Sequence, residues 1–330
     1  MTNTIINMNA PVKPKLYCSK CLGFCPCWWN GTVIYSDFVE KIKPFVDFVT
    51  HCPEVEIGLG APRKFVRIVL NGDIKTFVQP ATNGDFTQEM SDYIKKTVPK
   101  LQNLDGFILK ENSPSCSMSR VRYYRGSEKD AEIGGGGPGL FGEAILGRYG
   151  HLPIESDGRL RNQKIREVFL TRIFTLAAAK QVLESKKMGD LVEFHTNNKY
   201  LLMTFSQKRL RELGRITSNP DRVQFDEVAE RYLEILEKAL AVTPKSSMVV
   251  NVFSKIYGYF SKNLKADERK FFLSRLDSYR QGKLSITSLR ETLLLWALRF
   301  EQDYILKQTV FQPFPQELNE ICKLVQYQKE

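Results

Sequence analysis

Long apolar runs and a signal-like beginning are both missing from this sequence of 330 residues. No stretch of about 18 consecutive apolar residues exists, which excludes a transmembrane helix. The opening residues, MTNTIINMNAPVKPK, contain no basic region leading into an apolar stretch, so they give no secretory signal. We therefore expect a cytoplasmic protein without a membrane partner.

Acidic residues are outnumbered, with 37 Asp and Glu against 48 Lys and Arg, which gives a formal net charge of +11. The excess is local, because residues 159–222 contain 14 basic and 6 acidic side chains. Such a segment suits a polyanionic partner, since Lys and Arg that neutralise phosphates release condensed counterions. The alternative is a solvated helix face with no partner.

Nothing in the composition indicates extensive disorder, because 42% of the residues are hydrophobic and 26% are charged. A chain of 330 residues suggests two domains. Short apolar runs dominate up to residue 157, and helical periodicity follows. We expect an N-terminal extension over 1–14, an α/β domain over 15–157 and an all-α domain over 158–330.

Seven cysteines are present, an odd number that includes four within ten residues: Cys18, Cys21, Cys25 and Cys27. In a cytoplasmic chain, clustered cysteines more often bind metal or do redox chemistry than form disulfides. The spacing of the first pair suggests zinc. However, no second closely spaced Cys or His pair follows, and the three histidines are scattered.

A second grouping uses Cys21, Cys52 and Cys116, which lie in distinctive local sequence. The segments Phe45–Thr50 and Gly106–Leu109 resemble buried strands that run into the turns carrying Cys52 and Cys116. Strand ends in an α/β sheet converge on one edge. Three cysteines gathered there could hold three irons of a 4Fe–4S cluster and leave the fourth iron open as a Lewis acid.

The second half of the sequence predicts an all-α domain. Apolar residues recur at three- and four-residue steps from Ile165 to Leu176, and further helices are predicted around 226–241, 247–262, 266–281 and 286–307. The glycine run at 134–137 precedes a predicted helix but lacks the Lys-Ser/Thr ending of a P-loop. We interpret this run as a flexible connection.

Separated motifs then identify a resemblance over nearly the whole chain. Residues 15–125 resemble the TudS family of thiouracil desulfidases, and residues 159–328 resemble the YbgA-type helical domain often fused to it, an arrangement similar to the two-domain RudS-type desulfidases. The first resemblance rests on Cys21-Leu22-Gly23, Cys27-Trp28-Trp29-Asn30-Gly31, CPEVEIGLG from Cys52 with Pro62-Arg63, Asp105–Lys110 and Ser113–Cys116. The second rests on Gly158–Asn162, Arg166–Arg172 and Val192–Lys199.

The resemblance implies a 4Fe–4S cluster held by Cys21, Cys52 and Cys116. The open iron would take the thiocarbonyl sulfur of the substrate while water attacks the carbon. Glu54 is implied as general acid/base, Ser113 as hydrogen-bond donor or proton relay, and Lys110 as a balance for negative charge. The sequence departs from the family pattern at Trp28-Trp29, where an Arg-aromatic pair is expected, and at the additional Cys18 and Cys25.

Two-domain desulfidases of this type imply tRNA carrying 4-thiouridine as the substrate. Basic side chains of the second domain would then hold the RNA backbone and present the flipped base to the cluster. The candidates are Arg159, Arg161, Lys164, Arg166, Arg172, Lys199, Lys208, Arg209, Arg211 and Arg215.

Two alternatives remain open at this point. In one, the enzyme acts on free 2-thiouracil or 4-thio-UMP, and the helical domain forms a homodimer. In the other, the protein is a zinc-stabilised RNA-binding protein built on Cys18, Cys21, Cys25 and Cys27. Iron and sulfide content separates the second from any desulfidase.

Overall fold

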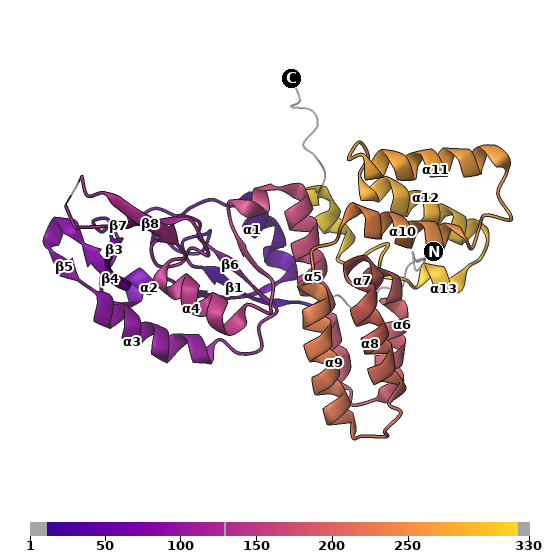
Figure 1. Cartoon of the computed structure of the whole chain (residues 1–330), viewed down its shortest axis with the longest axis horizontal. Helices are drawn as coiled ribbons and strands as arrows, with labels where there is room; N and C mark the ends of the chain where they lie inside the picture. The colour runs from indigo at the N-terminus through magenta and orange to yellow at the C-terminus, as the bar shows by residue number, and fades with distance from the viewer. Residues whose placement is uncertain (1–11, 129, 323–330) are drawn as a thin grey trace. The chain divides into compact units, whose positions relative to one another are not determined.

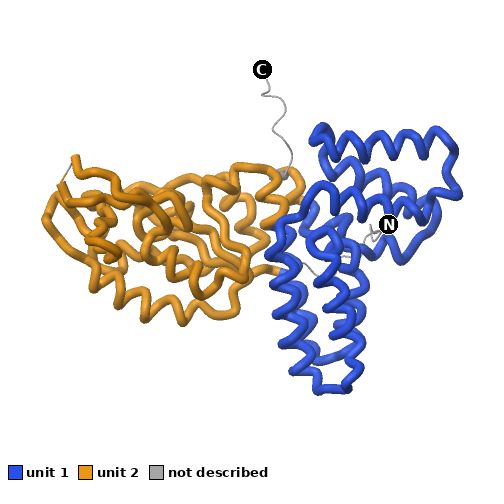
Figure 2. Tube along the Cα trace, in the orientation of Figure 1, with its two compact units in different colours: residues 1–12, 170–316 blue, residues 13–169, 317–330 orange. Residues whose placement is uncertain are grey.

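A computed structural model of the chain describes residues 12–128 and 130–322 (Figure 1). Most of the expected extension over 1–14 therefore lies outside the described residues. The chain divides into two compact units, one of residues 13–169 with 317–322 and one of residues 170–316 (Figure 2). The first is α/β and the second is built from helices, which confirms the expected fold class.

A fully parallel sheet forms the centre of the first unit. Its strand order is β2-β1-β6-β9, with all neighbouring pairs parallel. The bounds are β1 Lys15–Ser19, β2 Asp47–His51, β6 Gly106–Leu109 and β9 Ile154–Ser156. Strands β2 and β6 match the two strands predicted before Cys52 and Cys116.

The two inner strands of this sheet, β1 and β6, are buried on both faces. All four residues of β6 are buried, and Leu16 and Tyr17 of β1 have no exposed surface. Continuous apolar runs of this kind are typical of parallel strands covered on both sides. Tyr17 packs against Phe107 and Phe141, with ring centroids 5.7 and 5.6 Å away.

A second, mixed sheet in the same unit has the order β5-β4-β3-β7-β8. Its strands are β3 Arg67–Asn71, β4 Ile74–Gln79, β5 Gly84–Asp85, β7 Val121–Tyr124 and β8 Ile133–Gly137. Strand β8 contains the glycine run, so the interpretation of that run as a flexible connection is wrong. Because a Cβ on Gly136 would lie 2.9 Å from the Val121 carbonyl oxygen, glycine permits the close pairing with β7.

The described part of the α/β unit also contains the helices α1 Asp37–Ile42, α2 Pro53–Glu56, α3 Thr87–Thr97 and α4 Leu140–Tyr149, and the first residues of α5 (Gln163–Glu184). Helix α2 is a single turn that begins directly after Cys52, which is its N-cap residue. Gly58 and Gly60 follow it with φ values of 93° and 67°, a conformation that glycine adopts without a Cβ clash. This short turn therefore ends abruptly and leads the chain back toward residue 63.

The helical region begins with helix α5, which contains the apolar residues from Ile165 to Leu176 that predicted a helix. The described helices are α5 Gln163–Glu184, α6 Met188–Asn197, α7 Lys199–Phe205, α8 Gln207–Ser218, α9 Phe225–Leu240, α10 Ser246–Tyr257, α11 Ala266–Arg280, α12 Ile286–Arg299 and α13 Asp303–Leu306. Tyr200 to Phe205 of α7 are all buried, as expected for a central helix. No described helix is both long and apolar enough to cross a membrane.

Two predicted helices are shorter than expected. The segment 286–307 contains α12 and the separate turn α13, because Glu301 adopts a left-handed φ of 51° that interrupts the helix. The segment 247–262 is helical only to Tyr257, and turns follow from Gly258. Apolar residues continue through both interruptions, so periodicity alone does not reveal them.

Candidate active site

The carboxyl ends of the four parallel strands bring together the segments that carry the candidate residues. Cys21 follows β1, Cys52 follows β2, the turn from Lys110 to Cys116 follows β6, and Asp157 follows β9. This is the edge at which open α/β sheets bind their ligands. The sheet therefore positions Cys21, Cys52 and Cys116 from three different strand ends.

The three cysteines are buried thiols, with exposed fractions of 6%, 8% and 5% for Cys21, Cys52 and Cys116. Cys27, whose role the sequence left open, lies with them. Hydrogen bonding to the Cys21 thiol raises the pKa of Cys27 to about 12, and the Cys52 and Cys25 thiols are further sulfur neighbours. The Cys52 Sγ atom lies 3.8 Å from the Cys27 carbonyl oxygen.

Burial raises the pKa of the Cys116 thiol to about 12, and the negative charges of Cys52 and Glu54 act in the same direction. Hydrogen bonding to Cys27, followed by burial, raises the pKa of Cys52 well above its ordinary value. Such crowded thiols remain protonated unless a positive group binds them as thiolates. The sulfur donor set therefore fits an iron–sulfur cluster, whose irons prefer thiolate ligands.

The zinc alternative finds no support in the described part of the chain. There, no group of three or more His, Cys, Asp or Glu side chains is arranged to hold a single metal ion. Cys18 is fully buried within β1, and its electrostatic neighbours are Asp157 and Cys116. Cys25 is only partly buried. An iron–sulfur cluster needs a different arrangement, because each thiolate of a cluster binds a different iron.

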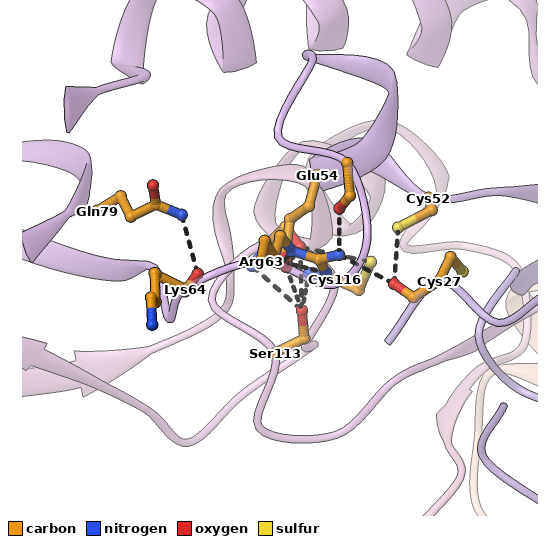
Figure 3. A network of polar contacts seen from close by, with 10 residues as sticks. Cys27, Cys52, Glu54, Arg63, Lys64, Gln79, Ser113 and Cys116 are labelled. Atoms are coloured by element: carbon orange, nitrogen blue, oxygen red, sulfur yellow. Dashed lines mark hydrogen bonds and ion pairs between the residues drawn. The ribbon is translucent and has the colours of Figure 1, made fainter. Parts of the chain in front are cut away.

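Glu54 lies at the centre of a buried polar network (Figure 3). Its Oε2 atom accepts a hydrogen bond from Arg63 Nε at 2.7 Å and lies 2.5 Å from Arg63 Nη2. Its Oε1 atom accepts hydrogen bonds from Ser115 Oγ at 2.5 Å and Ser113 Oγ at 3.3 Å. Both carboxylate oxygens are therefore satisfied, and the ion pair offsets the cost of burying the charge.

Ser113 has a structural role in the turn that ends at Cys116. Its Oγ atom accepts hydrogen bonds from the backbone N–H groups of Cys116 at 3.1 Å and Ser115 at 3.3 Å. Ser115 Oγ lies 3.7 Å from Cys116 Sγ. A serine hydroxyl has one hydrogen to donate, so Ser115 can donate either to Glu54 or to the Cys116 sulfur, but not to both. These serines connect the carboxylate to the cysteine.

Arg63 belongs to this site, although the sequence indicated it only as part of the Pro62-Arg63 motif and not as a site residue. Its side chain is 4% exposed, and Nη1 donates to the carbonyl oxygens of Cys27 at 3.0 Å and Gly60 at 2.9 Å. One guanidinium thus joins the loop carrying Cys27 to Glu54, as its planar fork of donors allows. A usable signal was its place directly after Gly-Leu-Gly-Ala-Pro, since such turns return the chain to a strand end.

Lys110 contacts a carboxylate rather than a cysteine in the described structure. Its Nζ atom lies 2.8 Å from Asp157 Oδ2, and both side chains are largely buried. Its backbone N–H donates to Ser19 Oγ at 3.0 Å, and its ammonium lies 5.6 Å from the Trp28 ring centroid. The positive charge of Lys110 is therefore already paired at the end of β9.

Helix α4 packs directly against the turn that carries Cys116. A Cβ on Gly139 would lie 2.5 Å from the Ser115 carbonyl oxygen, and one on Gly142 would collide with the Ser117 carbonyl oxygen. The backbone N–H of Gly142 donates to the Ser115 carbonyl oxygen at 2.9 Å. Glycine at both positions lets the helix backbone approach closely enough to hold the turn.

The candidate RNA-binding residues fall in both compact units. Arg159, Arg161, Lys164 and Arg166 belong to the first, whereas Arg172, Lys199, Lys208, Arg209, Arg211 and Arg215 belong to the second. Some of them already bind carboxylates within their own unit: Arg159 Nε lies 2.7 Å from Glu155 Oε2, and Arg209 Nη1 lies 2.6 Å from Glu212 Oε2. Local net charge therefore overstates the number of available cations.

Helix α8 carries the clearest basic face. Lys208, Arg211 and Arg215 are exposed and spaced by three and four residues, so they lie on one side of the helix. Leu210, Leu213 and Thr217 are buried on the other side. Among the described residues, no carboxylate forms an ion pair with these three cations.

Comparisons with known proteins divide the chain in the same order as the motifs did. Residues 16–157 match the family described as 2-thiouracil desulfurase, and residues 199–315 match the family described as a protein of unknown function, DUF1722. These matches confirm the resemblance to a two-domain desulfidase.

Among curated relatives, the uncharacterized protein YbbK of Bacillus subtilis (strain 168) is 34% identical over 128 residues, which cover 36% of this chain and 82% of YbbK. The uncharacterized protein YbgA of Escherichia coli (strain K12) is 23% identical over 159 residues, which cover 48% of this chain and 94% of YbgA. A solved structure of a [4Fe-4S]-dependent thiouracil desulfidase, TudS, is 27% identical, with a TM-score of 0.33, 45% of this chain covered and 93% of that chain.

Proposed function

Because the chain belongs to the 2-thiouracil desulfurase family, we propose that it removes sulfur from 4-thiouridine in tRNA, converting C=S to C=O with water. A 4Fe–4S cluster held by Cys21, Cys52 and Cys116 is part of this proposal. The observation that carries it is the set of three buried cysteines at one edge of a parallel sheet, with Glu54 hydrogen-bonded to the turn that ends at Cys116.

The cluster, when bound, supplies a Lewis-acidic iron that can accept the thiocarbonyl sulfur. The remaining chemistry belongs to the chain. The Glu54 carboxylate accepts a proton from the attacking water through Oε1, the oxygen that faces the two serines. Arg63 keeps Oε2 bound, so the carboxylate does not rotate away from this position.

Ser113 and Ser115 complete the path for the proton. Their hydroxyls are 3.0 Å apart and both contact Glu54 Oε1, and Ser115 also approaches Cys116 Sγ. A proton taken up by Glu54 can therefore be shared with the Ser113 and Ser115 hydroxyls, while Cys116 would stay deprotonated as a cluster ligand. Lys110, paired with Asp157, balances negative charge only as part of that ion pair.

The helical domain would capture the RNA. The exposed cations Lys208, Arg211 and Arg215 on α8 form a line suited to a phosphate backbone. We assign catalysis to residues 15–157 and substrate capture to residues 158–330, with cytoplasmic tRNA as the partner.

A smaller substrate, 2-thiouracil or 4-thio-UMP, is the second candidate. The match to the desulfurase family favours this candidate, because it ends at residue 157. The family is therefore defined without the helical unit, which begins at residue 170. In this case the helical domain would serve another purpose, such as homodimer formation.

The deciding experiment uses the anaerobically reconstituted full chain. Thiolated tRNA, 4-thio-UMP and 2-thiouracil are supplied in parallel, and released sulfide and the nucleoside or base product are measured. Loss of 4-thiouridine from tRNA at a rate above that of 4-thio-UMP supports the first candidate. Unchanged 4-thiouridine in tRNA with turnover of the small substrates would favour the second, and no sulfide from any substrate would refute both.

A further inference from the structure

The helical unit contains a cavity of about 500 Å³ that none of the residues assigned above reaches. Its wall is formed by α5, by α6 and by the segment that follows α13. All of the lining residues belong to the unit of residues 170–316. Its volume is within the range of pockets that hold small organic ligands.

The wall is held in place by hydrogen bonds between α6 and the segment after α13. Asn198 donates through Nδ2 to the Phe194 carbonyl oxygen at 2.9 Å and accepts from Thr309 Oγ1 at 2.7 Å. The Thr309 backbone N–H donates to the Asn197 carbonyl oxygen at 2.9 Å. These hydrogen bonds join the Val192–Lys199 motif to the segment after α13, so the motif and that segment together form this part of the cavity wall.

Several polar side chains of the cavity remain available. Thr175 is 4% exposed, and its hydroxyl makes no hydrogen bond to any residue in the described ranges. The side-chain amide of Asn197 likewise has no partner in the part of the chain that the structure describes. Neither group is among the buried unpaired atoms of the described residues, so both are open to the space of the cavity, where solvent or a ligand can be the partner.

The composition of the wall selects the kind of ligand. Phe174 and Phe194, which are 6% and 8% exposed, contribute only ring edges to the wall, and Asn197 offers an amide with both a donor and an acceptor. Two carboxylates, Asp190 and Glu193, face a single cation, Lys307, so the site disfavours a phosphate. Carboxylates are the groups that accept hydrogen bonds from ribose hydroxyls.

We propose that this cavity binds an uncharged nucleoside. The base packs against the phenylalanine rings and pairs with the Asn197 amide, and the ribose hydroxyls donate to Asp190 and Glu193. Thr175 hydrogen-bonds to the edge of the base. This site is separate from the cysteine site and does not depend on the proposed desulfidase activity.

The test measures binding of uridine, adenosine, UMP and spermidine to the full-length protein by calorimetry, with saturation-transfer NMR for weak ligands. We expect at least one nucleoside to bind, and UMP to bind about tenfold more weakly than uridine. Tighter binding of UMP or of spermidine than of either nucleoside, or no nucleoside binding at all, overturns the proposal.

Two variants locate the site. Thr175→Val removes the hydroxyl at nearly constant volume, and Asn197→Ala removes the amide; each should weaken nucleoside binding about tenfold. Thr217→Val, on α8, is the matched control, because its hydroxyl already donates to the Gly214 carbonyl oxygen at 2.9 Å. Unchanged nucleoside affinity in both cavity variants, with melting temperatures like that of the control, places the ligand elsewhere and refutes the assignment.

Discussion

At the residue scale, the ion pair between Arg63 and Glu54 is the most consequential contact of the candidate site. The two side chains are 4% and 8% exposed, so neither charge is solvated by bulk water. Removing one partner leaves the other as an uncompensated buried charge. Stability and site geometry therefore depend on the same contact.

The first prediction follows from this burial. Arg63→Met should reduce the free energy of unfolding by about 3–5 kcal/mol, because the Glu54 carboxylate loses its counterion. Urea denaturation followed by tryptophan fluorescence measures the change. The control is Arg231→Met, which breaks an exposed pair with Glu227 and should cost about 1 kcal/mol or less. Equal effects of the two substitutions would show that burial does not set the strength of the Arg63 pair.

The second prediction concerns the cysteine ligands. After anaerobic reconstitution, Cys21→Ser, Cys52→Ser and Cys116→Ser should each lose most of the iron, the acid-labile sulfide and the visible absorption, because the cluster would keep only two thiolates. Cys25→Ser, at a partly exposed thiol, is the control and should retain all three signals. An intact cluster in Cys52→Ser or Cys116→Ser would refute the ligand assignment.

At the element scale, helix α4 provides a matched pair of glycines. Gly142 packs against the Ser117 carbonyl oxygen, whereas a Cβ on Gly147 would meet no atom within 4 Å. Gly142→Ala should therefore displace the turn that carries Cys116 and reduce iron content after reconstitution. Gly147→Ala should leave the iron content unchanged and stabilise the helix by about 1 kcal/mol. Comparable iron content in the two variants would argue against support of the turn by α4.

His195, on α6, gives a pH-dependent prediction for the helical unit. Burial, with a smaller contribution from the Lys199 charge, lowers the pKa of His195 to about 4, and its Nδ1 atom lies 3.2 Å from the Tyr232 hydroxyl. The unfolded chain binds a proton near its ordinary pKa of about 6.5, so the folded state loses stability as the pH falls from 6.5 toward 4.

We expect this loss to be about 1–2 kcal/mol, allowing for the partial solvent exposure of the ring. NMR titration of the His195 ring measures its pKa directly, and urea denaturation at several pH values measures the stability. His195→Gln should flatten the dependence between pH 6.5 and 4. A ring that titrates near 6.5 in the folded protein would contradict the prediction.

The elements also show what the sequence could reveal. The strand before Lys110 was predictable, because a strand buried on both faces has a continuous apolar run, and the strand before Cys52 was predictable from its own run of apolar residues although none of its residues is fully buried. Strand β8 was not, since its glycines carry no apolar signal and it forms by pairing with β7. Arg63 was only partly predictable: the turn before it indicates that the chain returns to the sheet, but the burial of its charge against Glu54 depends on the folded structure.

At the scale of the whole molecule, the sequence predicts the net charge but not which basic side chains are free to bind a partner. The sequence does not show that Arg159 and Arg209 are bound by Glu155 and Glu212, since ion pairing depends on side-chain geometry. The exposed face of α8 remains as the clearest candidate surface. Its contribution can be separated from the chemistry by comparing substrates of different size.

Changing Lys208, Arg211 and Arg215 together to Glu should lower kcat/KM for thiolated tRNA about tenfold or more, and leave turnover of 4-thio-UMP unchanged, because only the RNA reaches these cations. The salt dependence of tRNA binding should also weaken. A triple change to Glu at the exposed Lys262, Arg269 and Lys270 is the control with the same change in net charge. Equal losses in both triple variants would point to overall charge instead of α8.

The order of the strands along the chain has a consequence for synthesis on the ribosome. The four parallel strands that position the cysteines are all encoded before residue 157, and the helical unit begins only at residue 170. Every sulfur and carboxylate of the candidate site is therefore translated before that helical unit. Folding of the nascent chain can bring the thiols together while the helical unit is still being made, although residues 317–322 of the same α/β unit are added last.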